Sequence, residues 1–373
     1  MDEIKQKDLD DIWNSISDVC PYSSYLSENV VKKDDWIDTG SMVLNALISG
    51  SLYGGIPRGR VTQFAGPSQT FKTGFVLKIL ANAQKRGMHV VIFDTEGAID
   101  AESAAAMGLD VNKVRHIKTQ TAENARNGAF KLLKTIKDKG WDGQFIIAID
   151  SLANLQSEME VSRMDKENTS ADMGTFAKSI KSLLKTLTVM SSLTNTPVIV
   201  TNHVYDDPSQ MYPTLEKNIA GGKAAVYLPS VTVQLARKAA KDDGGKTIED
   251  TKAASQKTFS GVIIRALTVK NRFVKQYLEG EMFLSFATGL DKYYGLVDIM
   301  KEFGVVNLNG PTYTDWKGEK LGFYKQWKNK EEIWQYLLPE LESRLKKEWA
   351  YSNKLGDSEV PDEDDTEIEE DED

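Results

Sequence analysis

Residues 60–74, RVTQFAGPSQTFKTG, place a lysine and a threonine where phosphate chemistry needs them. A short apolar run leads into a glycine-led loop, and Lys72 and Thr73 stand directly before a helix-like segment. In a phosphate-binding loop of this layout, backbone N–H groups hold the phosphates, the lysine reaches the β- and γ-oxygens, and the hydroxyl ligates Mg²⁺. These residues predict a nucleoside triphosphate site, with an ordinary turn before a helix as the alternative.

One residue departs from the usual pattern G-x-x-x-x-G-K-[ST], because Phe71 stands in place of the second glycine. A glycine there lets the backbone approach the phosphate with no β-carbon in the way. We therefore expect Phe71 to have a negative φ and a ring that points away from the nucleotide.

The elements that must position this loop alternate along the chain from Gly40 onward. Strand-like apolar runs occur at 60–66, 90–96, 145–150, 198–203, 231–237 and 262–269, and helix-like segments include 73–86, 121–138 and 174–194. Such alternation indicates an α/β fold with a parallel sheet covered by helices on both faces. Ligands of such sheets bind beyond the carboxyl ends of the strands.

Three polar side chains follow strand-like runs at that edge. Asp150, after FIIAI, is placed to orient the shell of a bound Mg²⁺, or else to cap a helix. Glu96 is the candidate general base that holds the attacking water, with a surface turn as the alternative. His203 is placed to sense the γ-phosphate and signal to the following loop, or else is satisfied by the backbone.

Two polar stretches, 156–172 and 204–222, carry no clear period and are long for connections in a compact domain. We expect both to be mobile and functional, with solvated connectors as the alternative. The residues in and beside them that suit DNA, by charge or by stacking, are Arg163, Met164, Lys166, Tyr205, Met211, Tyr212, Lys217 and Lys223. Lys270 and Arg272 form a basic pair that suits a γ-phosphate held by a neighbouring subunit, unless they are ordinary surface cations.

The totals limit the class of protein. The chain has 373 residues, of which 40% are hydrophobic, enough for one large core domain with smaller appendages. It has no apolar run of membrane-spanning length and no signal-peptide pattern, so we expect a cytoplasmic protein without a membrane partner. Cys20 is the single cysteine and there are three histidines, so neither a disulfide framework nor a structural zinc site is expected.

The net charge of −9 is concentrated at the C-terminus. Residues 357–373 hold 12 of the 55 acidic residues and no lysine or arginine, so the rest of the chain has 46 basic and 43 acidic residues. Such a block is usually a solvated, disordered tail. The functional alternative is that it competes with DNA phosphates for the basic surface of the body.

The ends of the chain carry smaller units. Near the N-terminus, a set of apolar residues at helical spacing predicts one apolar face that packs on another surface: Leu9, Ile12, Trp13, Ile16 and Val19. After Asp291 we expect a helix at 295–303, a turn-rich segment through Asn309-Gly310-Pro311, and an amphipathic helix at 331–348.

Taken together and in order, these motifs resemble the RecA family of strand-exchange recombinases from about residue 34 to 330. The resemblance is carried by TGS (39–41), the phosphate loop, TEGAID (95–100), AIDSLANL (148–155), the TNH and GGK frame of the second polar stretch, VKNR (269–272) and WKGEKLG (316–322). The F-K-T of the loop and the N-H after the fourth strand resemble the phage UvsX type of this family.

The resemblance implies a domain plan: an N-terminal helical oligomerisation segment (1–33), a RecA-like core of mostly parallel sheet (34–290), a small α+β C-terminal domain (291–348) and an acidic disordered tail (349–373). It also implies ATP and Mg²⁺ as cofactors. Catalysis would rest on Glu96 and Lys72, and the metal on Thr73 and Asp150.

Further roles follow from the resemblance alone. Nucleotide contacts would come from Gly66, Pro67, Ser68, Gln69, Thr70, Phe71, Lys72, Thr73, Asp100, His203, Lys270, Arg272 and Phe286. Ser103 stands where bacterial relatives stack a tyrosine, so adenine would be held more loosely. The two polar stretches become DNA-binding loops, to which Gly221 and Gly222 also belong.

The implied function is ATP-dependent homologous recombination. Filaments on single-stranded DNA would pair it with double-stranded DNA and exchange strands, with DNA-stimulated ATP hydrolysis. Implied partners are other copies of the chain, a single-strand-binding protein and a loading mediator, in the host cytoplasm if the chain is phage-encoded. Two alternatives share the core. Unwinding without strand exchange would favour a ring helicase motor, and a degenerate nucleotide site would favour a non-hydrolysing mediator.

Overall fold

The computed structural model describes residues 6–20, 36–164, 174–205, 217–242, 247–248 and 259–349. Lys166, Met211, Tyr212 and the expected tail from residue 350 onward lie outside these ranges. Within the ranges, no helix is long and apolar enough to cross a membrane. The same residues hold no group of three or more His, Cys, Asp or Glu side chains arranged for a metal ion.

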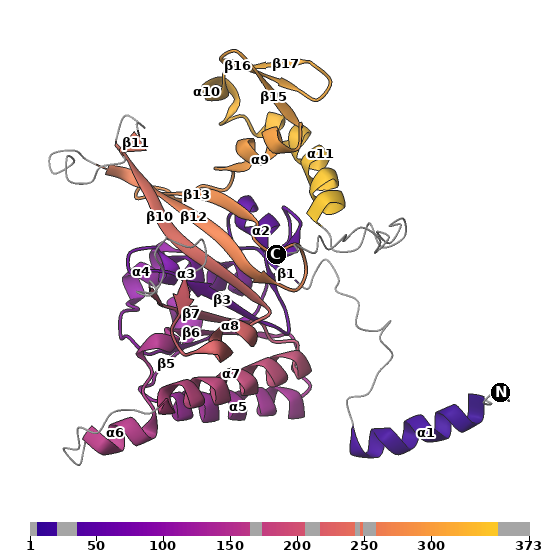
Figure 1. Cartoon of the computed structure of the whole chain (residues 1–373), viewed down its shortest axis with the longest axis vertical. Helices are drawn as coiled ribbons and strands as arrows, with labels where there is room; N and C mark the ends of the chain where they lie inside the picture. Colours follow the sequence, from indigo (N-terminus) through magenta and orange to yellow (C-terminus); the bar gives the residue numbers. More distant parts are fainter. Residues whose placement is uncertain are drawn as a thin grey trace, which may run out of the picture.

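A ten-stranded sheet forms the centre of the described structure (Figure 1). Its order is β14-β13-β12-β10-β3-β7-β6-β4-β5, with β11 paired to β10. The parallel strands are β10 (Val231–Asp242), β3 (Val61–Ala65), β7 (Val198–Asn202), β6 (Phe145–Asp150), β4 (His89–Asp94) and β5 (Val114–Lys118). The predicted α/β fold with a mostly parallel sheet is confirmed.

The other strands are antiparallel: β11 (Thr247–Ile248), β12 (Phe259–Asn271), β13 (Glu279–Ser285) and β14 (Gly289–Leu290). The run 262–269 was expected among the parallel strands, and that part of the prediction is wrong. Between β10 and β12 the described chain holds no helix, and an antiparallel neighbour needs no crossover helix.

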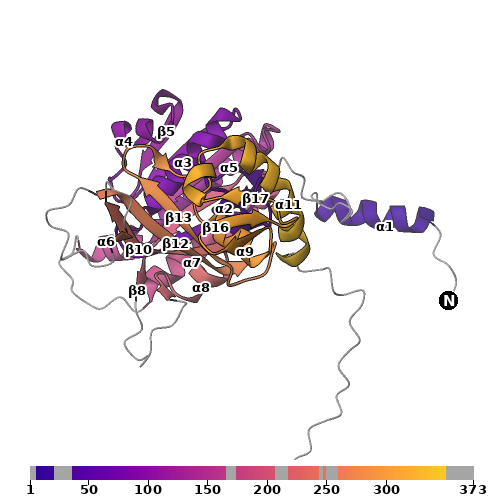
Figure 2. The ribbon, with the colours of Figure 1, turned by 90° about the horizontal axis from the view of Figure 1, so that it is seen from above.

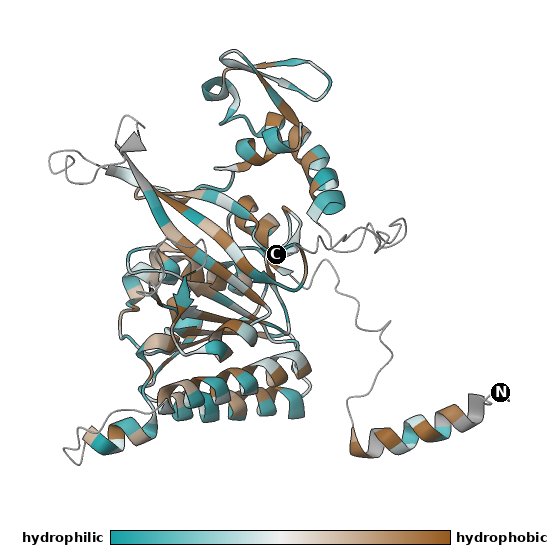
Figure 3. Cartoon of the chain, viewed as in Figure 1, coloured by the Kyte–Doolittle hydropathy of each residue, from teal (hydrophilic) through white to brown (hydrophobic). Residues whose placement is uncertain are grey.

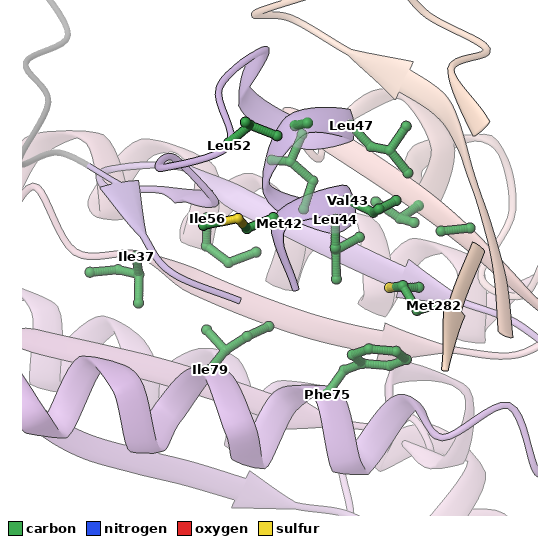
Figure 4. Packing of buried hydrophobic residues seen from close by; sticks show 14 of the residues in the cluster. Ile37, Met42, Val43, Leu44, Leu47, Leu52, Ile56, Phe75, Ile79 and Met282 are labelled. Carbon is green, nitrogen blue, oxygen red and sulfur yellow. The ribbon is translucent and has the colours of Figure 1, made fainter. Parts of the chain in front are cut away.

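Helices cover both faces of the sheet. The first face carries α2 (Met42–Ser49), α3 (Lys72–Lys85) and α4 (Ala101–Ala106), and the second carries α5 (Ala122–Asp138), α7 (Thr175–Leu193) and α8 (Lys223–Tyr227). Because successive strand residues point to opposite faces, Ile146 joins the first buried cluster and Ile147 the second. Figure 4 shows the first cluster, with residues of α2 facing residues of α3.

Short elements frame the ends of the strands. β1 (Trp36–Ile37) pairs with β2 (Ile56–Pro57), and β8 (Val204–Tyr205) pairs with β9 (Asn218–Ile219). Two single turns of 3₁₀ helix, η3 (Val111–Lys113) and η4 (Leu152–Asn154), precede β5 and follow β6. The first polar stretch also contains a helix that its sequence does not indicate, α6 (Glu158–Met164).

A small C-terminal unit follows the sheet, with both predicted helices. It comprises α9 (Leu296–Glu302), β15 (Val306–Asn309), β16 (Thr312–Asp315), β17 (Lys320–Gly322), α10 (Tyr324–Trp327) and α11 (Glu331–Trp349). Its centre is aromatic, because Trp327 and Trp334 are buried and the Trp334 ring stacks on Tyr293 at 4.6 Å between centroids. Figure 2 shows α11 beside the strands of this unit.

The N-terminal helix α1 (Gln6–Val19) forms as predicted. Its Ile12 and Ile16 side chains are 47% and 40% exposed, and brown apolar segments recur along the helix in Figure 3. Both views of the ribbon place α1 apart from the sheet (Figures 1 and 2). The apolar face is therefore available to a further surface.

Candidate active site

The phosphate loop joins the end of β3 to the start of α3, and Lys72 folds back across it. The Lys72 Nζ donates to the carbonyl oxygens of Gly66 (2.9 Å) and Pro67 (2.8 Å), and the Thr70 hydroxyl also donates to Pro67 (2.8 Å). Lys72 is 8% exposed. Burial lowers the pKa of its ammonium, and the nearby Asp150 and Glu96 carboxylates oppose that shift. The lysine is thus held at the loop by acceptors that phosphate oxygens can replace.

Phe71 corrects our expectation for this loop. Its φ is +63°, in the left-handed region, and not negative as predicted. The backbone therefore keeps the conformation that a glycine would take, at a strain of about 1–2 kcal/mol. The ring contacts Phe75 edge-on at 5.6 Å between centroids and lies over Gly74. We infer that this packing offsets the strain.

Asp150 and Thr73 meet at the carboxyl end of β6. The Thr73 hydroxyl donates to Asp150 Oδ2 at 2.6 Å, and the Thr201 hydroxyl donates to Oδ1. Asp150 is 4% exposed, and burial raises the pKa of its carboxyl, opposed by these two hydrogen bonds. Neither oxygen caps a helix; Ser151 stands at the N-cap of η4. A paired hydroxyl and carboxylate fit Mg²⁺, which prefers oxygen ligands.

Glu96 lies across from this pair. Its Oε1 accepts a hydrogen bond from the Ser151 hydroxyl at 2.7 Å and lies 3.4 Å from His203 Nε2. The turn at Glu96 and Gly97 is held by Asp94, whose Oδ1 accepts the N–H groups of Glu96 (3.1 Å) and Gly97 (2.7 Å). Asp94 therefore fixes the backbone of Glu96, and Ser151 fixes its carboxylate.

A cavity of about 510 Å³ unites these groups. Predicted residues that line it are Ser68, Gln69, Thr70, Phe71, Lys72, Thr73, Glu96, Asp150 and His203. The remaining lining residues are mainly apolar: Gly74, Leu77, Ala98, Ile99, Ser103, Ala106 and Met107. The cavity thus combines polar groups that suit phosphates with apolar surface that suits a base.

A larger cavity of about 620 Å³ lies against β10, β12, β13 and α9, away from this chemistry. Its Lys238 contacts Glu281 and its Arg265 contacts Glu279. Two of its three lining cations are thus paired with carboxylates, and Arg237 is the third. The smaller cavity, which holds Lys72 at the phosphate loop, is the better candidate for an anionic ligand.

Other predicted residues lie outside the cavity lining. Asp100 is the N-cap of α4, and its two oxygens accept the Ser103 N–H (2.8 Å) and hydroxyl (2.7 Å), which lower the pKa of its carboxyl. Lys270 and Arg272 lie at and just beyond the end of β12, and the Lys270 Nζ donates to the Tyr227 carbonyl. Phe286 follows β13 and is 62% exposed.

The predicted DNA residues that are described lie at two places. Arg163 and Met164 end α6, and Met164 is 56% exposed. The others surround the second polar stretch: Tyr205 on β8, Lys217 before β9, and Gly221, Gly222 and Lys223 at the start of α8. Both glycines have positive φ.

Sequence reasoning missed the residues that hold the site in place. Asp94, Ser151 and Thr201 stand within two positions of predicted residues, so a search of strand ends could have found them. His116 gave no such signal. Its Nε2 lies 2.9 Å from Asp94 Oδ2 only because β4 and β5 pair in parallel.

A family model described as the RecA N-terminal domain matches residues 24–291. The chain belongs to the RecA family. It is similar to Protein RecA of Chlorobium chlorochromatii, with 29% identity over 286 residues, 77% of this chain and 74% of the relative. Protein RecA of Thermus aquaticus is 28% identical over 316 residues (84% and 86%), and that of Rhodococcus jostii 28% over 331 residues (89% and 86%). Every residue that lines the cavity of about 510 Å³ lies in the matched range.

Proposed function

We propose that this protein is an ATP-dependent recombinase that assembles on single-stranded DNA and exchanges strands with a homologous duplex. The observation that supports this most is the single cavity in which Lys72, Thr73, Asp150 and Glu96 meet in a RecA-family core. A mediator with a degenerate site would not need all four groups held in hydrogen-bonding geometry.

Each group has a separate task in ATP hydrolysis. Lys72 exchanges its two carbonyl acceptors for phosphate oxygens. Thr73 and Asp150 would hold Mg²⁺, and a bound Mg²⁺ would supply positive charge to offset that of the phosphates. Because Ser151 and His203 both face Oε1 of Glu96, its Oε2 is the oxygen that accepts the proton of the attacking water.

The basic pair acts on a neighbouring protomer. Lys270 and Arg272 do not line the cavity of their own protomer, so they suit a γ-phosphate held by the next copy. The exposed α1 face would join copies, and Phe286 and Asp100 would complete the nucleotide contacts across the junction. ATP then acts as a switch of DNA affinity through the loops at 156–172 and 204–222.

Finer assignments belong to the same proposal. Phe71 in the phosphate loop and His203 after β7 support the phage UvsX type, which places the protein in the cytoplasm of an infected host. A single-strand-binding protein and a loading mediator are the partners that such an activity would use.

The test is Glu96→Gln, which keeps the shape of the side chain and removes the base. DNA-stimulated ATP hydrolysis should fall about 100-fold or more, with ATP binding retained. Glu102→Gln, an exposed glutamate on α4, is the matched control and should hydrolyse ATP normally. Undiminished hydrolysis by Glu96→Gln would reject Glu96 as the base.

A further inference from the structure

Two amide side chains are buried on neighbouring strands of the central sheet. Gln63, on β3, and Asn202, at the end of β7, have no exposed surface. A buried amide destabilises a fold unless it is hydrogen-bonded, whereas a leucine of similar size would pack there without that requirement. Their presence calls for a function beyond packing.

The two amides bind each other and the segment that closes the second polar stretch. Asn202 Nδ2 donates to Gln63 Oε1 (3.3 Å) and to the Ala220 carbonyl (2.9 Å). Gln63 Nε2 donates to the Ala225 carbonyl (3.0 Å), which lies on α8. Carbonyls near the C-terminus of a helix lack partners within it, so Gln63 satisfies one of them.

The same pair is joined to the phosphate loop. Gly66, its first residue, donates its N–H to the Asn202 carbonyl at 3.2 Å. β3 carries Gln63 and runs directly into this loop, and it pairs in parallel with β7. Hydrogen bonds therefore connect Gly66 to Ala220 through Asn202. They also connect Gly66 to Ala225 through Asn202 and Gln63.

We propose that Gln63 is a positioning residue which, with Asn202, couples nucleotide binding to the DNA-binding segment 217–227. The inference rests on the proposed function, because it concerns how that function is regulated. Gln63 has no exposed surface and does not line the cavity of about 510 Å³, so we assign it no direct contact with either ligand. It holds α8, and with it Lys223, in a fixed relation to the strand that carries the phosphate loop.

The test is Gln63→Leu, which fills the same volume without the two hydrogen bonds. The measured quantity is the ratio of single-stranded DNA Kd values with ADP and with a non-hydrolysable ATP analogue. A coupling of two ligands is typically about 5- to 150-fold, and we expect Gln63→Leu to reduce this ratio to below about threefold. Affinity for the ATP analogue without DNA should remain within about twofold of wild type.

Gln234→Leu is the matched control. Gln234 is also a nearly buried amide, and it binds the Lys217 N–H (3.0 Å) and carbonyl (2.8 Å) from β10, which does not carry the phosphate loop. Its loss should weaken DNA binding equally with both nucleotides and leave the ratio intact. If Gln63→Leu fails to fold, Gln63→Met serves, because its flexible thioether can fill the site and has no donor for Ala225.

The outcomes separate the two proposals. A wild-type protein with no nucleotide dependence of DNA binding would refute the proposed function, and the inference with it. If Gln63→Leu keeps the wild-type ratio of DNA Kd values, or if Gln234→Leu lowers that ratio as much as Gln63→Leu does, the inference is refuted. The proposed function would stand in either case.

Discussion

Gly74 is explained by a side chain three residues before it. A β-carbon on Gly74 would lie 2.1 Å from Cζ of the Phe71 ring, a distance that no packed structure tolerates. Glycine inside a helix destabilises it by about 0.5–1 kcal/mol relative to alanine. The Phe71 ring thus occupies the space that a side chain at position 74 would need.

This close contact predicts a rescue. Gly74→Ala alone should displace the Phe71 ring and weaken ATP binding at least tenfold. The double variant Phe71→Gly with Gly74→Ala should restore binding, and it should gain about 0.5–1 kcal/mol in helix stability. ATP titration and thermal unfolding measure the two effects. Normal ATP binding by Gly74→Ala alone would contradict the explanation.

Lys270 gives a pH-dependent signature. Burial, with the Arg272 charge, lowers its pKa to about 8 from the ordinary 10.5. Between these values the unfolded chain binds more protons than the folded one, so the Lys270 contribution to stability rises with pH. Below pH 8 the lysine is charged in both states and its contribution is constant.

We therefore expect the free energy of unfolding of wild type, relative to Lys270→Met, to increase between pH 8 and pH 10. Chemical denaturation at several pH values measures this difference. A flat difference across that range would show that the lysine is not desolvated in the protomer.

At the scale of elements, strand pairing assembles the support of Glu96. In the parallel register, Asp94 of β4 lies beside Asp150 of β6, so two carboxylates reach the same edge of the sheet. His116 comes from β5, on the other side of β4, and its Nε2 lies 2.9 Å from Asp94, whose side chain is 1% exposed. A buried carboxylate that loses a partner destabilises its surroundings.

His116→Ala should therefore loosen the turn that carries Glu96. We expect kcat for ATP hydrolysis to fall about 10- to 100-fold with little change in KM, because positioning errors act on the chemical step. His116→Gln can still donate to Asp94 and should recover most of the activity. His89→Ala, a control in the first residue of β4, should behave as wild type. Equal losses in His116→Ala and His116→Gln would argue against a positioning role.

At the scale of the whole molecule, the C-terminal unit is anchored to the core. Glu342 of α11 accepts the Ser51 hydroxyl at 2.6 Å and the Leu52 N–H at 2.7 Å, and the Lys275 N–H donates to the Trp349 carbonyl at 3.1 Å. The last described helix thus ends at the core, and the acidic residues 357–373 follow it in the sequence. Trp349, the last described residue before that segment, therefore lies against the core.

Removal of residues 357–373 should raise affinity for duplex DNA, by about tenfold at low salt, because the charge balance of the chain becomes positive. A tail of the same length with its acids changed to Asn and Gln should have the same effect, which separates charge from length. Binding measured across a salt series tests this. Unchanged affinity would leave the tail without a role in DNA binding.

The order of apolar runs and polar residues along the sequence determined much of the sheet and of the candidate site. The apolar runs of β3, β4, β6 and β7 and the polar residues at their ends predicted the sheet and the meeting of Glu96, Asp150 and His203, because parallel strands present their carboxyl ends at one edge. β5 escaped notice because its edge position leaves it half exposed, without an apolar run.

Only the tertiary structure decided which residues hold that chemistry in place. Residue type and spacing carry no signature of the contact of His116 with Asp94 or of the Gln63–Asn202 pair. The sequence drew attention to Phe71 but predicted the wrong sign of its φ. The two pairs join residues 22 and 139 positions apart, and strand register alone brings them within hydrogen-bonding distance. A linear pattern records which groups a chain has, whereas packing determines which of them touch.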